Sequence, residues 1–347
     1  MTRQIRSALE ELRHETFVLA RPGSGPRAAK AAAAADAVDP VWDQPRITEG
    51  SAHEMPASEY LGWARSNSLE AIFFDENYQF EEVRALRDAG IRTIGRFVWE
   101  YFAEQHVVGA RDAYDTIYSL HLAERDRYAS MGIDSPYIQW GIHPELLAAG
   151  GAASESAQGD VVRFYFPGSF LGKRKPIRKV VKAFKATEGE HLRLTISAQV
   201  PRNDDFLQQA AASDPRIELA LEDEPEERHR ARFAGCDVCL APSRWEGLGI
   251  PLVEATAFGM PIITNDKPPM SELVRDGESG ILIPSSENGT ARSGIVAWDP
   301  DIAAMTTAIE RLGRRGELAR LREGVAEVRE ERAWEHTVAG YARLLEA

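Results

Sequence analysis

Two glutamates, Glu246 and Glu254, stand eight positions apart with Gly247 and Gly249 between them, in the segment PSRWEGLGIPLVEATAFGMPIITND. Glycine lets a backbone approach a ligand closely, and the free N–H groups at the beginning of a helix attract phosphate. Pro251 is suited to begin such a helix, which would hold Glu254 about one turn inside it. A carboxylate before the loop can accept hydrogen bonds from sugar hydroxyls, and one inside the helix can accept them from a ribose. The alternative is an ordinary strand–loop–helix turn whose glycines serve geometry alone.

A run of basic residues interrupts a chain whose formal net charge is −13. That charge argues against a nucleic-acid partner or an anionic membrane surface. The run is a local exception, and its later members are equally well explained as the solvated face of a helix. Its members are Lys173, Arg174, Lys175, Arg178, Lys179, Lys182 and Lys185.

Two further patterns have structural explanations. Cys236 and Cys239 are the only cysteines, and on a strand such a pair points to opposite faces, so buried thiols are expected rather than a disulfide or a metal site. Asp299-Pro300-Asp301 has the letters of a metal-binding D-x-D motif, but it directly precedes a helical pattern. Aspartate and proline are cap and first-turn residues there, so no essential metal is expected.

Short apolar segments alternate with amphipathic ones, which predicts parallel sheets with crossover helices. In the first half the predicted helices are 5–12, 81–89, 106–113 and 123–131, and the strands are 16–20, 71–74, 93–98, 116–118 and 137–139. In the second half the predicted strands are 161–166, 192–197, 217–220, 238–240, 262–264 and 280–283. The helices there are 176–185, 225–234, 252–258, 301–311, 317–329 and 334–345.

A length of 347 residues suits two domains. A linker rich in glycine, alanine and serine, 148–160, is expected to separate domain 1–147 from domain 161–330, and 331–347 forms a closing helix. Residues 21–52, with an alanine tract at 31–35, are expected to be a mobile loop rather than an exposed helix. There is no apolar run of membrane-spanning length and no signal-peptide core, which favours a cytoplasmic location.

The segment around Glu246 and Glu254 resembles the donor signature of the family 4 glycosyltransferases, P-S-x-x-E-G-x-G-x-P-x-x-E-A-x-A-x-G-x-P-V-I. SELVRDGESGILIP, with Glu272, resembles a second segment of that family, and FPGSFLGKRKP resembles the strand and glycine loop that open its donor domain. RAWEHTVAGYARLL resembles its closing helix, which packs back across the first domain. The resemblance implies an α/β protein of GT-B architecture, in which two Rossmann-like doubly wound domains face each other across a cleft.

The same resemblance assigns roles on the donor side. Glu246 would contact the donor sugar and Glu254 the ribose, and Lys175 matches a lysine that binds the diphosphate. Lys175 and the helix N-terminus would stabilise the departing diphosphate. The remaining donor-binding candidates are Gly168, Ser169, Arg174, Gly247 and the amides of Leu248, Gly249 and Ile250. Ser169 stands where the family has an arginine, so Lys173 or Arg174 is the expected substitute.

The first half matches the family less closely. It begins at what corresponds to the family's first helix, without the preceding strand and glycine loop. The family often has a histidine at the end of a middle strand, facing the donor sugar. Trp99 and Glu100 stand there in RTIGRFVWEYF. Glu100 is therefore a catalytic candidate beside Glu246 and Lys175, able to orient an acceptor hydroxyl, although a charged residue at a strand end is commonly just solvated.

Together these features predict a retaining, metal-independent hexosyltransferase. It would need no cofactor beyond its substrate, a UDP- or GDP-linked sugar, and would act on a sugar, glycan or small-molecule acceptor. No protein nucleophile is nominated, because retention in this family is explained by attack on the face from which the leaving group departs. Two alternatives stay open: a donor-binding but catalytically impaired homologue that acts as a partner subunit, and another enzyme on the same architecture, such as a sugar-nucleotide epimerase.

Overall fold

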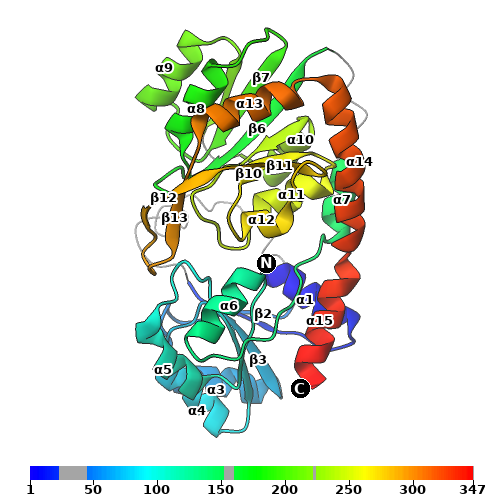
Figure 1. Ribbon diagram of the computed structural model, residues 1–347. Coiled ribbons are helices and arrows are strands. Elements are labelled where there is room, and N and C mark those ends of the chain that lie inside the picture. Colours follow the sequence, from blue (N-terminus) through cyan, green and yellow to red (C-terminus); the bar gives the residue numbers. More distant parts are fainter. Residues whose placement is uncertain (23–44, 152–159, 222–223, 347) are drawn as a thin grey trace.

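The computed structural model describes residues 1–22, 45–151, 160–221 and 224–346, which form two lobes, each built on parallel strands (Figure 1). The predicted α/β class is confirmed by this arrangement. The alanine tract at 31–35, predicted to be mobile, lies outside the described residues, as does most of the predicted linker at 152–159. Among the described helices, none combines the length and the apolar character that crossing a membrane requires.

The first lobe is organised around a three-stranded parallel sheet in the order β3-β4-β5. Its strands are β3 (Ala71–Asp75), β4 (Arg92–Arg96) and β5 (Thr116–Ile117), and a separate parallel pair is formed by β1 (Val18–Ala20) and β2 (Ile47–Glu49). Its helices are α1 (Thr2–Glu11), α3 (Ala57–Ser66), α4 (Phe80–Asp88), α5 (Glu104–Ala113) and α6 (Leu122–Ser130). The strand predicted at 137–139 is wrong, because that segment makes only a single bridge between Ser119 and Tyr137.

The second lobe contains a six-stranded parallel sheet in the order β11-β10-β9-β6-β7-β8. Its strands are β6 (Val162–Ser169), β7 (Leu192–Ala198), β8 (Ile217–Leu221), β9 (Val238–Leu240), β10 (Ile262–Asn265) and β11 (Gly280–Ile283). Its helices are α8 (Ile177–Lys185), α9 (Asp205–Ser213), α10 (Glu226–Ala234), α11 (Ile250–Ala257), α12 (Met270–Leu273), α13 (Ile302–Leu312) and α14 (Arg315–Glu331). All the predicted strands of this lobe are present.

The sequence explains why β6 and β9 lie at the centre of this sheet. Phe164, Tyr165 and Phe166 follow one another in β6 and are all fully buried, as in a strand covered by helices on both faces. In α8, Val180, Val181 and Phe184 are buried against the sheet, while Lys182 and Lys185 on the other face are exposed. The carboxyl ends of parallel strands meet at one edge, so the loops after β6 and β9 are brought together there.

An antiparallel hairpin extends from the second lobe toward the first (Figure 1). It consists of β12 (Ser285–Thr290) and β13 (Val296–Pro300), neither of which was predicted. The reason is physical: β12 is polar and nearly all exposed, so it has no apolar alternation to signal a strand. Similarly, α7 (Pro144–Gly151) extends into the predicted linker at 148–160, so the boundary between the two predicted domains stays a prediction.

The closing segment joins the two lobes. α14 runs along one side of the molecule and α15 (Trp334–Glu346) lies against the first lobe (Figure 1). There the Arg92 guanidinium donates to the carbonyl oxygens of Leu344 and Leu345, each at 2.8 Å, and α15 packs against α1. The predicted return of the last helix to the first part of the chain is confirmed by these contacts.

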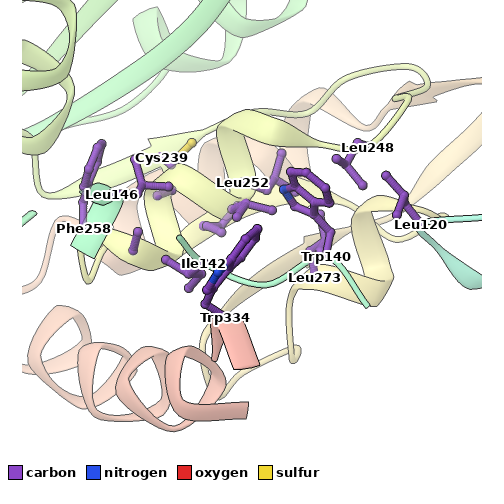
Figure 2. Packing of buried hydrophobic residues seen from close by; sticks show 14 of the residues in the cluster. Leu120, Trp140, Ile142, Leu146, Cys239, Leu248, Leu252, Phe258, Leu273 and Trp334 are labelled. Atoms are coloured by element: carbon purple, nitrogen blue, oxygen red, sulfur yellow. The ribbon is translucent and has the colours of Figure 1, made fainter. Parts of the chain in front are cut away.

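One of the buried apolar clusters spans both lobes (Figure 2). Leu120, Trp140 and Ile142 precede the second lobe in the chain, and they belong to the same buried cluster as Leu248 and Leu252. Trp334 of α15 completes it, with its ring edge-on to Trp140 at a centroid distance of 6.1 Å. The lobes are therefore packed together on this side by apolar contacts as well as joined by the chain.

Candidate functional site

The loop between β9 and α11 has the geometry that the glycines predict. Gly249 is the N-cap of α11 and has a φ of 73°, in the left-handed region that glycine adopts without strain. Pro251 occupies the first turn, and Glu254 lies one turn further into the helix. The amides of Gly249 and Ile250 stand at the beginning of α11, where backbone N–H groups have no intrahelical acceptor. The helix start is thus available to an anion.

Glu246 is a buried carboxylate held by two cations. Its Oε1 lies 2.6 Å from the Lys175 Nζ, and its Oε2 pairs with the Arg174 guanidinium. Lys175 also donates to the Ser243 Oγ at 2.8 Å. Burial raises the cost of ionising Glu246, but Lys175 and then Arg174 outweigh it, and the pKa of the carboxyl is lowered. Glu246 is therefore ionised, and its two cationic partners, Arg174 and Lys175, stand about seventy positions earlier in the chain.

The cations of this triad come from the loop after β6. Gly168 lies so close to β7 that a Cβ there would be 2.8 Å from the Ser197 carbonyl oxygen, which explains the glycine. Ser169 ends the strand, and the following segment reaches the other loop, where the Arg244 amide donates to the Arg174 carbonyl at 2.9 Å. Of the two substitutes expected for the missing arginine, Arg174 contacts Glu246, whereas the Lys173 side chain is exposed.

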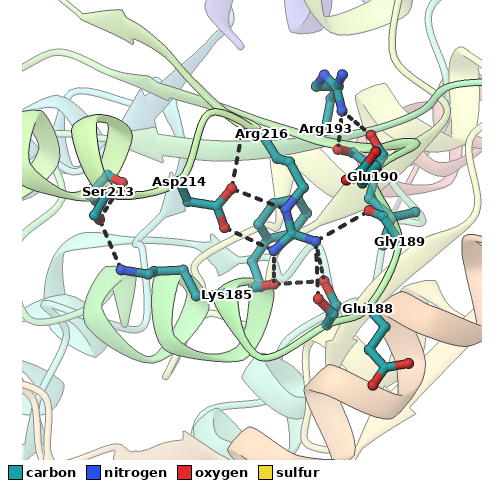
Figure 3. Close-up of polar contacts among 12 residues, drawn as sticks. Lys185, Glu188, Gly189, Glu190, Arg193, Ser213, Asp214 and Arg216 are labelled. Atoms are coloured by element: carbon teal, nitrogen blue, oxygen red, sulfur yellow. Dashed lines mark hydrogen bonds and ion pairs between the residues drawn. The ribbon is translucent and has the colours of Figure 1, made fainter.

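Two later members of the basic run, Arg178 and Lys185, make contacts within the second lobe. Lys185 donates to the Ser213 Oγ at 2.9 Å, beside a network in which Arg216 bonds Asp214 and the Thr187 carbonyl (Figure 3). Figure 3 shows Lys185 directed at Ser213, the last residue of α9. Arg178 lies over the Phe206 ring at 4.2 Å. These contacts agree with the structural explanation of this part of the run, and Arg174 and Lys175 are the members that contact Glu246.

Glu254 lines a hollow where the two lobes meet. The hollow is lined by Gln4, Trp140 and His143 from the first part of the chain and by Arg230 of α10. Burial raises the pKa of the Glu254 carboxyl to about 7, and Arg230 opposes that shift. Glu254 therefore exchanges a proton near neutral pH, in contrast to Glu246. Glu246 is not among the residues that line this hollow, so a cleft shared by the two glutamates stays a prediction.

Two residues of the first lobe, Trp99 and Glu100, contact the loop between β9 and α11 that carries Gly247 and Gly249. A Cβ placed on Gly247 would lie 2.7 Å from the Glu100 Oε2, so the glycine permits this close approach. Glu100 is half-buried, and burial raises the pKa of its carboxyl while Arg174 opposes the change. Trp99 donates its indole N–H to the Glu246 carbonyl oxygen at 2.6 Å. The strand end at which the family often has a histidine is thus in contact with the loop.

The two remaining predictions concern sulfur and metal. Cys236 and Cys239 are both free and buried, as expected, and burial raises the pKa of the Cys236 thiol to about 12. Asp301 caps α13 by accepting from the Ala304 amide at 2.7 Å, which confirms its structural role. Asp299 lies on β13 instead and pairs with Lys179 at 3.0 Å and Arg244 at 2.5 Å. Within the described parts of the chain, no three His, Cys, Asp or Glu side chains are grouped as metal ligands.

Sequence reasoning missed Ser243 and the role of Trp99. Ser243 stands directly in the quoted motif, so its contact with Lys175 could have been suspected from position alone. Trp99 offered no such signal, because an indole N–H that bonds a carbonyl 147 residues away leaves no local pattern. Leu248 is different again: its side chain belongs to the buried core, so only its backbone is left for a ligand.

The fold and the site define a class of protein, and comparison with known proteins agrees with it. Residues 157–297 match the family model described as glycosyl transferases group 1. The chain also shares its architecture with HepE from Anabaena, crystallised in complex with UDP and glucose. The TM-score is 0.60 at 14% identity, over 84% of this chain and 81% of that one. The predicted GT-B fold is thereby confirmed, and glycosyltransferase, the predicted class of enzyme, is the class to which the family match points.

Two curated relatives are similar over shorter stretches. The lipopolysaccharide core biosynthesis mannosyltransferase LpsB of Rhizobium meliloti is 39% identical over 57 residues, 16% of each chain. The D-inositol 3-phosphate glycosyltransferase of Nocardia farcinica is 24% identical over 228 residues, 62% of this chain and 47% of the relative. The chain therefore spans less than half of the length of each of these relatives.

Proposed function

We propose that this protein is a retaining glycosyltransferase of family 4 type, which moves a sugar from a nucleoside diphosphate to an acceptor hydroxyl. The observation that carries the proposal is the triad formed by the buried Glu246 and Lys175 with the partly exposed Arg174, together with the N-terminus of α11. A helix start and two cations suit a diphosphate, and an ionised carboxylate suits sugar hydroxyls.

The roles of the residues follow from this arrangement. The diphosphate would lie against the amides of Gly249 and Ile250, with Arg174 able to turn toward it because its side chain is 31% exposed. Glu246 would accept from hydroxyls of the donor sugar, and Glu254 from the ribose. Lys175, which is buried, would act through the positive potential it adds behind the loop.

The reaction forms a bond between the acceptor oxygen and the anomeric carbon and breaks the bond from that carbon to the diphosphate oxygen. The acceptor proton passes to the departing diphosphate, so the products are a glycoside and a nucleoside diphosphate. Glu100 would orient the acceptor hydroxyl from the opposite lobe. Negative charge grows on the leaving group, and Arg174, Lys175 and the α11 amides would stabilise it without a metal ion.

The relatives support a nucleotide-sugar donor. HepE was crystallised with UDP and glucose, and LpsB is named as a mannosyltransferase. For this chain we infer a UDP- or GDP-linked hexose as donor and a sugar, glycan or small molecule as acceptor. No further cofactor is proposed.

Incubation with UDP- and GDP-sugars and a panel of pyranoside acceptors tests the proposal. The expected result is release of the nucleoside diphosphate together with a glycoside whose anomeric configuration, read by NMR, equals that of the donor. An inverted product would refute retention. A rearranged nucleotide sugar with no nucleoside diphosphate released would favour an epimerase instead.

A further inference from the structure

Trp99 connects the first lobe to the backbone of Glu246, the residue that is proposed to bind the donor sugar. Its ring is buried, with 9% of the residue exposed, and its indole N–H donates to the Glu246 carbonyl oxygen at 2.6 Å. The side chain of Glu246 is held by Arg174 and Lys175 from its own lobe. The main chain of Glu246 is thus fixed from one lobe and its carboxylate from the other.

The indole is itself supported from a second contact between the lobes. His121 lies edge-on to the Trp99 ring at a centroid distance of 4.9 Å. Burial lowers the pKa of His121 to about 3, so the imidazole packs as a neutral ring. His121 is the N-cap of α6, and Glu272 of α12 accepts from the next two amides, those of Leu122 at 2.7 Å and Ala123 at 2.9 Å.

These contacts form a path that crosses between the lobes twice. It runs from Glu272 to the start of α6, through His121 to Trp99, and from Trp99 back to Glu246. The β12–β13 hairpin adds apolar support, because Ala291 and Ile295 near its tip pack against Trp99. Arg127 of α6 also donates to the Ser293 carbonyl at 2.6 Å. The contact between His121 and Trp99 lies within the first lobe, whereas the contacts with Glu246, Glu272, Ala291, Ile295 and Ser293 exist only while the two lobes are together.

We propose that Trp99 is a positioning residue that couples the approach of the two lobes to the placement of Glu246. When the lobes separate, the carbonyl of Glu246 loses its donor and the loop before Gly247 loses its support from the first lobe. The donor sugar would then lack a fixed carboxylate, whereas the ribose and diphosphate contacts on the second lobe would be retained. This inference rests on the proposed function, and it separates binding of the nucleotide from binding of the sugar.

Trp99→Phe tests the coupling, because it removes the N–H and keeps most of the ring. Trp63→Phe is the matched control: Trp63 lies on α3 of the same lobe, and its buried indole nitrogen has no hydrogen-bond partner among the described residues. For Trp99→Phe we expect kcat/KM for the nucleotide sugar to fall about 3- to 10-fold, the range for one lost hydrogen bond. The affinity for UDP and for GDP, titrated alone, should stay at the wild-type value, and Trp63→Phe should match wild type in both.

A second variant, Glu272→Ala, keeps the proposal testable if Trp99→Phe does not fold. Glu272→Ala removes the other contact, at a position that is partly exposed, and should give the same pattern of reduced kcat/KM with unchanged nucleoside diphosphate affinity. The coupling is refuted if Trp99→Phe and Glu272→Ala both behave as Trp63→Phe does. It is equally refuted if they weaken UDP or GDP binding as much as turnover, because the damage would then lie in the second lobe. Absence of turnover in the wild type would instead count against the proposed function.

Discussion

At the scale of residues, the account depends on a carboxylate that is buried and yet ionised. Glu246 and Lys175 are each only 2% exposed, so neither charge is solvated and each requires the other. Breaking such a pair leaves an uncompensated charge, whereas replacing both partners removes the cost on both sides. The pair is therefore testable by its energetics, independently of any substrate.

Lys175→Met is expected to lower the free energy of unfolding by about 3 kcal/mol, because it leaves Glu246 buried with Arg174 as its only cation. The double variant Lys175→Met/Glu246→Gln should recover part of that loss. Lys182→Met, at an exposed position on the outer face of α8, is the control and should change stability little. Urea denaturation measures all three. Equal stability of Lys175→Met and Lys182→Met would contradict the buried ion pair.

Glu254 gives a prediction in pH. Its pKa is about 7 in the folded protein against an ordinary value of 4.5. The folded state therefore holds a proton that the unfolded state releases, so the stabilising contribution is complete below pH 4.5 and is lost as the pH rises through 7. Glu254→Gln removes this dependence. Its Tm relative to wild type should rise by roughly 2–4 °C between about pH 5 and pH 8.

The control for this prediction is Glu227→Gln, which changes an exposed carboxyl on α10. Its Tm difference from wild type should be the same at both pH values. If Glu254→Gln were just as insensitive to pH, the raised pKa of Glu254 would be wrong.

At the scale of elements, Asp301 at the start of α13 allows a helix-capping role to be distinguished from a metal-binding role by experiment. Asp301→Ala removes the bond to the Ala304 amide and should cost about 1 kcal/mol of stability, and Asp301→Asn, which can still cap, should cost less. Turnover of a nucleotide sugar should be unchanged in Asp301→Ala and insensitive to EDTA. A loss of turnover that added Mn²⁺ or Mg²⁺ restores would show instead that the D-x-D letters mark a metal site.

The elements also show how far the sequence could be interpreted. Strands such as β6 and β10 are short runs of apolar residues between helices, so their positions followed from hydrophobic pattern. The β12–β13 hairpin has no such pattern and is held by pairing and by contacts of its tip with the first lobe. α7 resembles a linker in composition, yet it packs against α10 and α11. The β12–β13 hairpin and α7 both depend on tertiary contacts, and such contacts cannot be predicted from the pattern of a short sequence segment.

At the scale of the whole molecule, the sequence nominated candidate site residues on one lobe but did not predict how the other lobe contacts them. Lys175 and Glu246 were predictable because a resemblance linked both to one ligand. The approach of Glu100 to Gly247, and the bond from Trp99 to Glu246, depend on the relative placement of two sheets. That placement is set by the shared apolar core and by the closing helix, far from the site in sequence.

Calorimetric titration of the protein with UDP- and GDP-linked sugars tests the central claim most directly. The account predicts that at least one binds with a Kd below about 1 mM, equivalent to more than about 4 kcal/mol. It also predicts that Glu254→Ala weakens this binding at least about tenfold, which corresponds to the loss of the hydrogen bonds between Glu254 and the ribose hydroxyls. Failure of every such nucleotide sugar to bind at millimolar concentration, with no change on substituting Glu254, would contradict it.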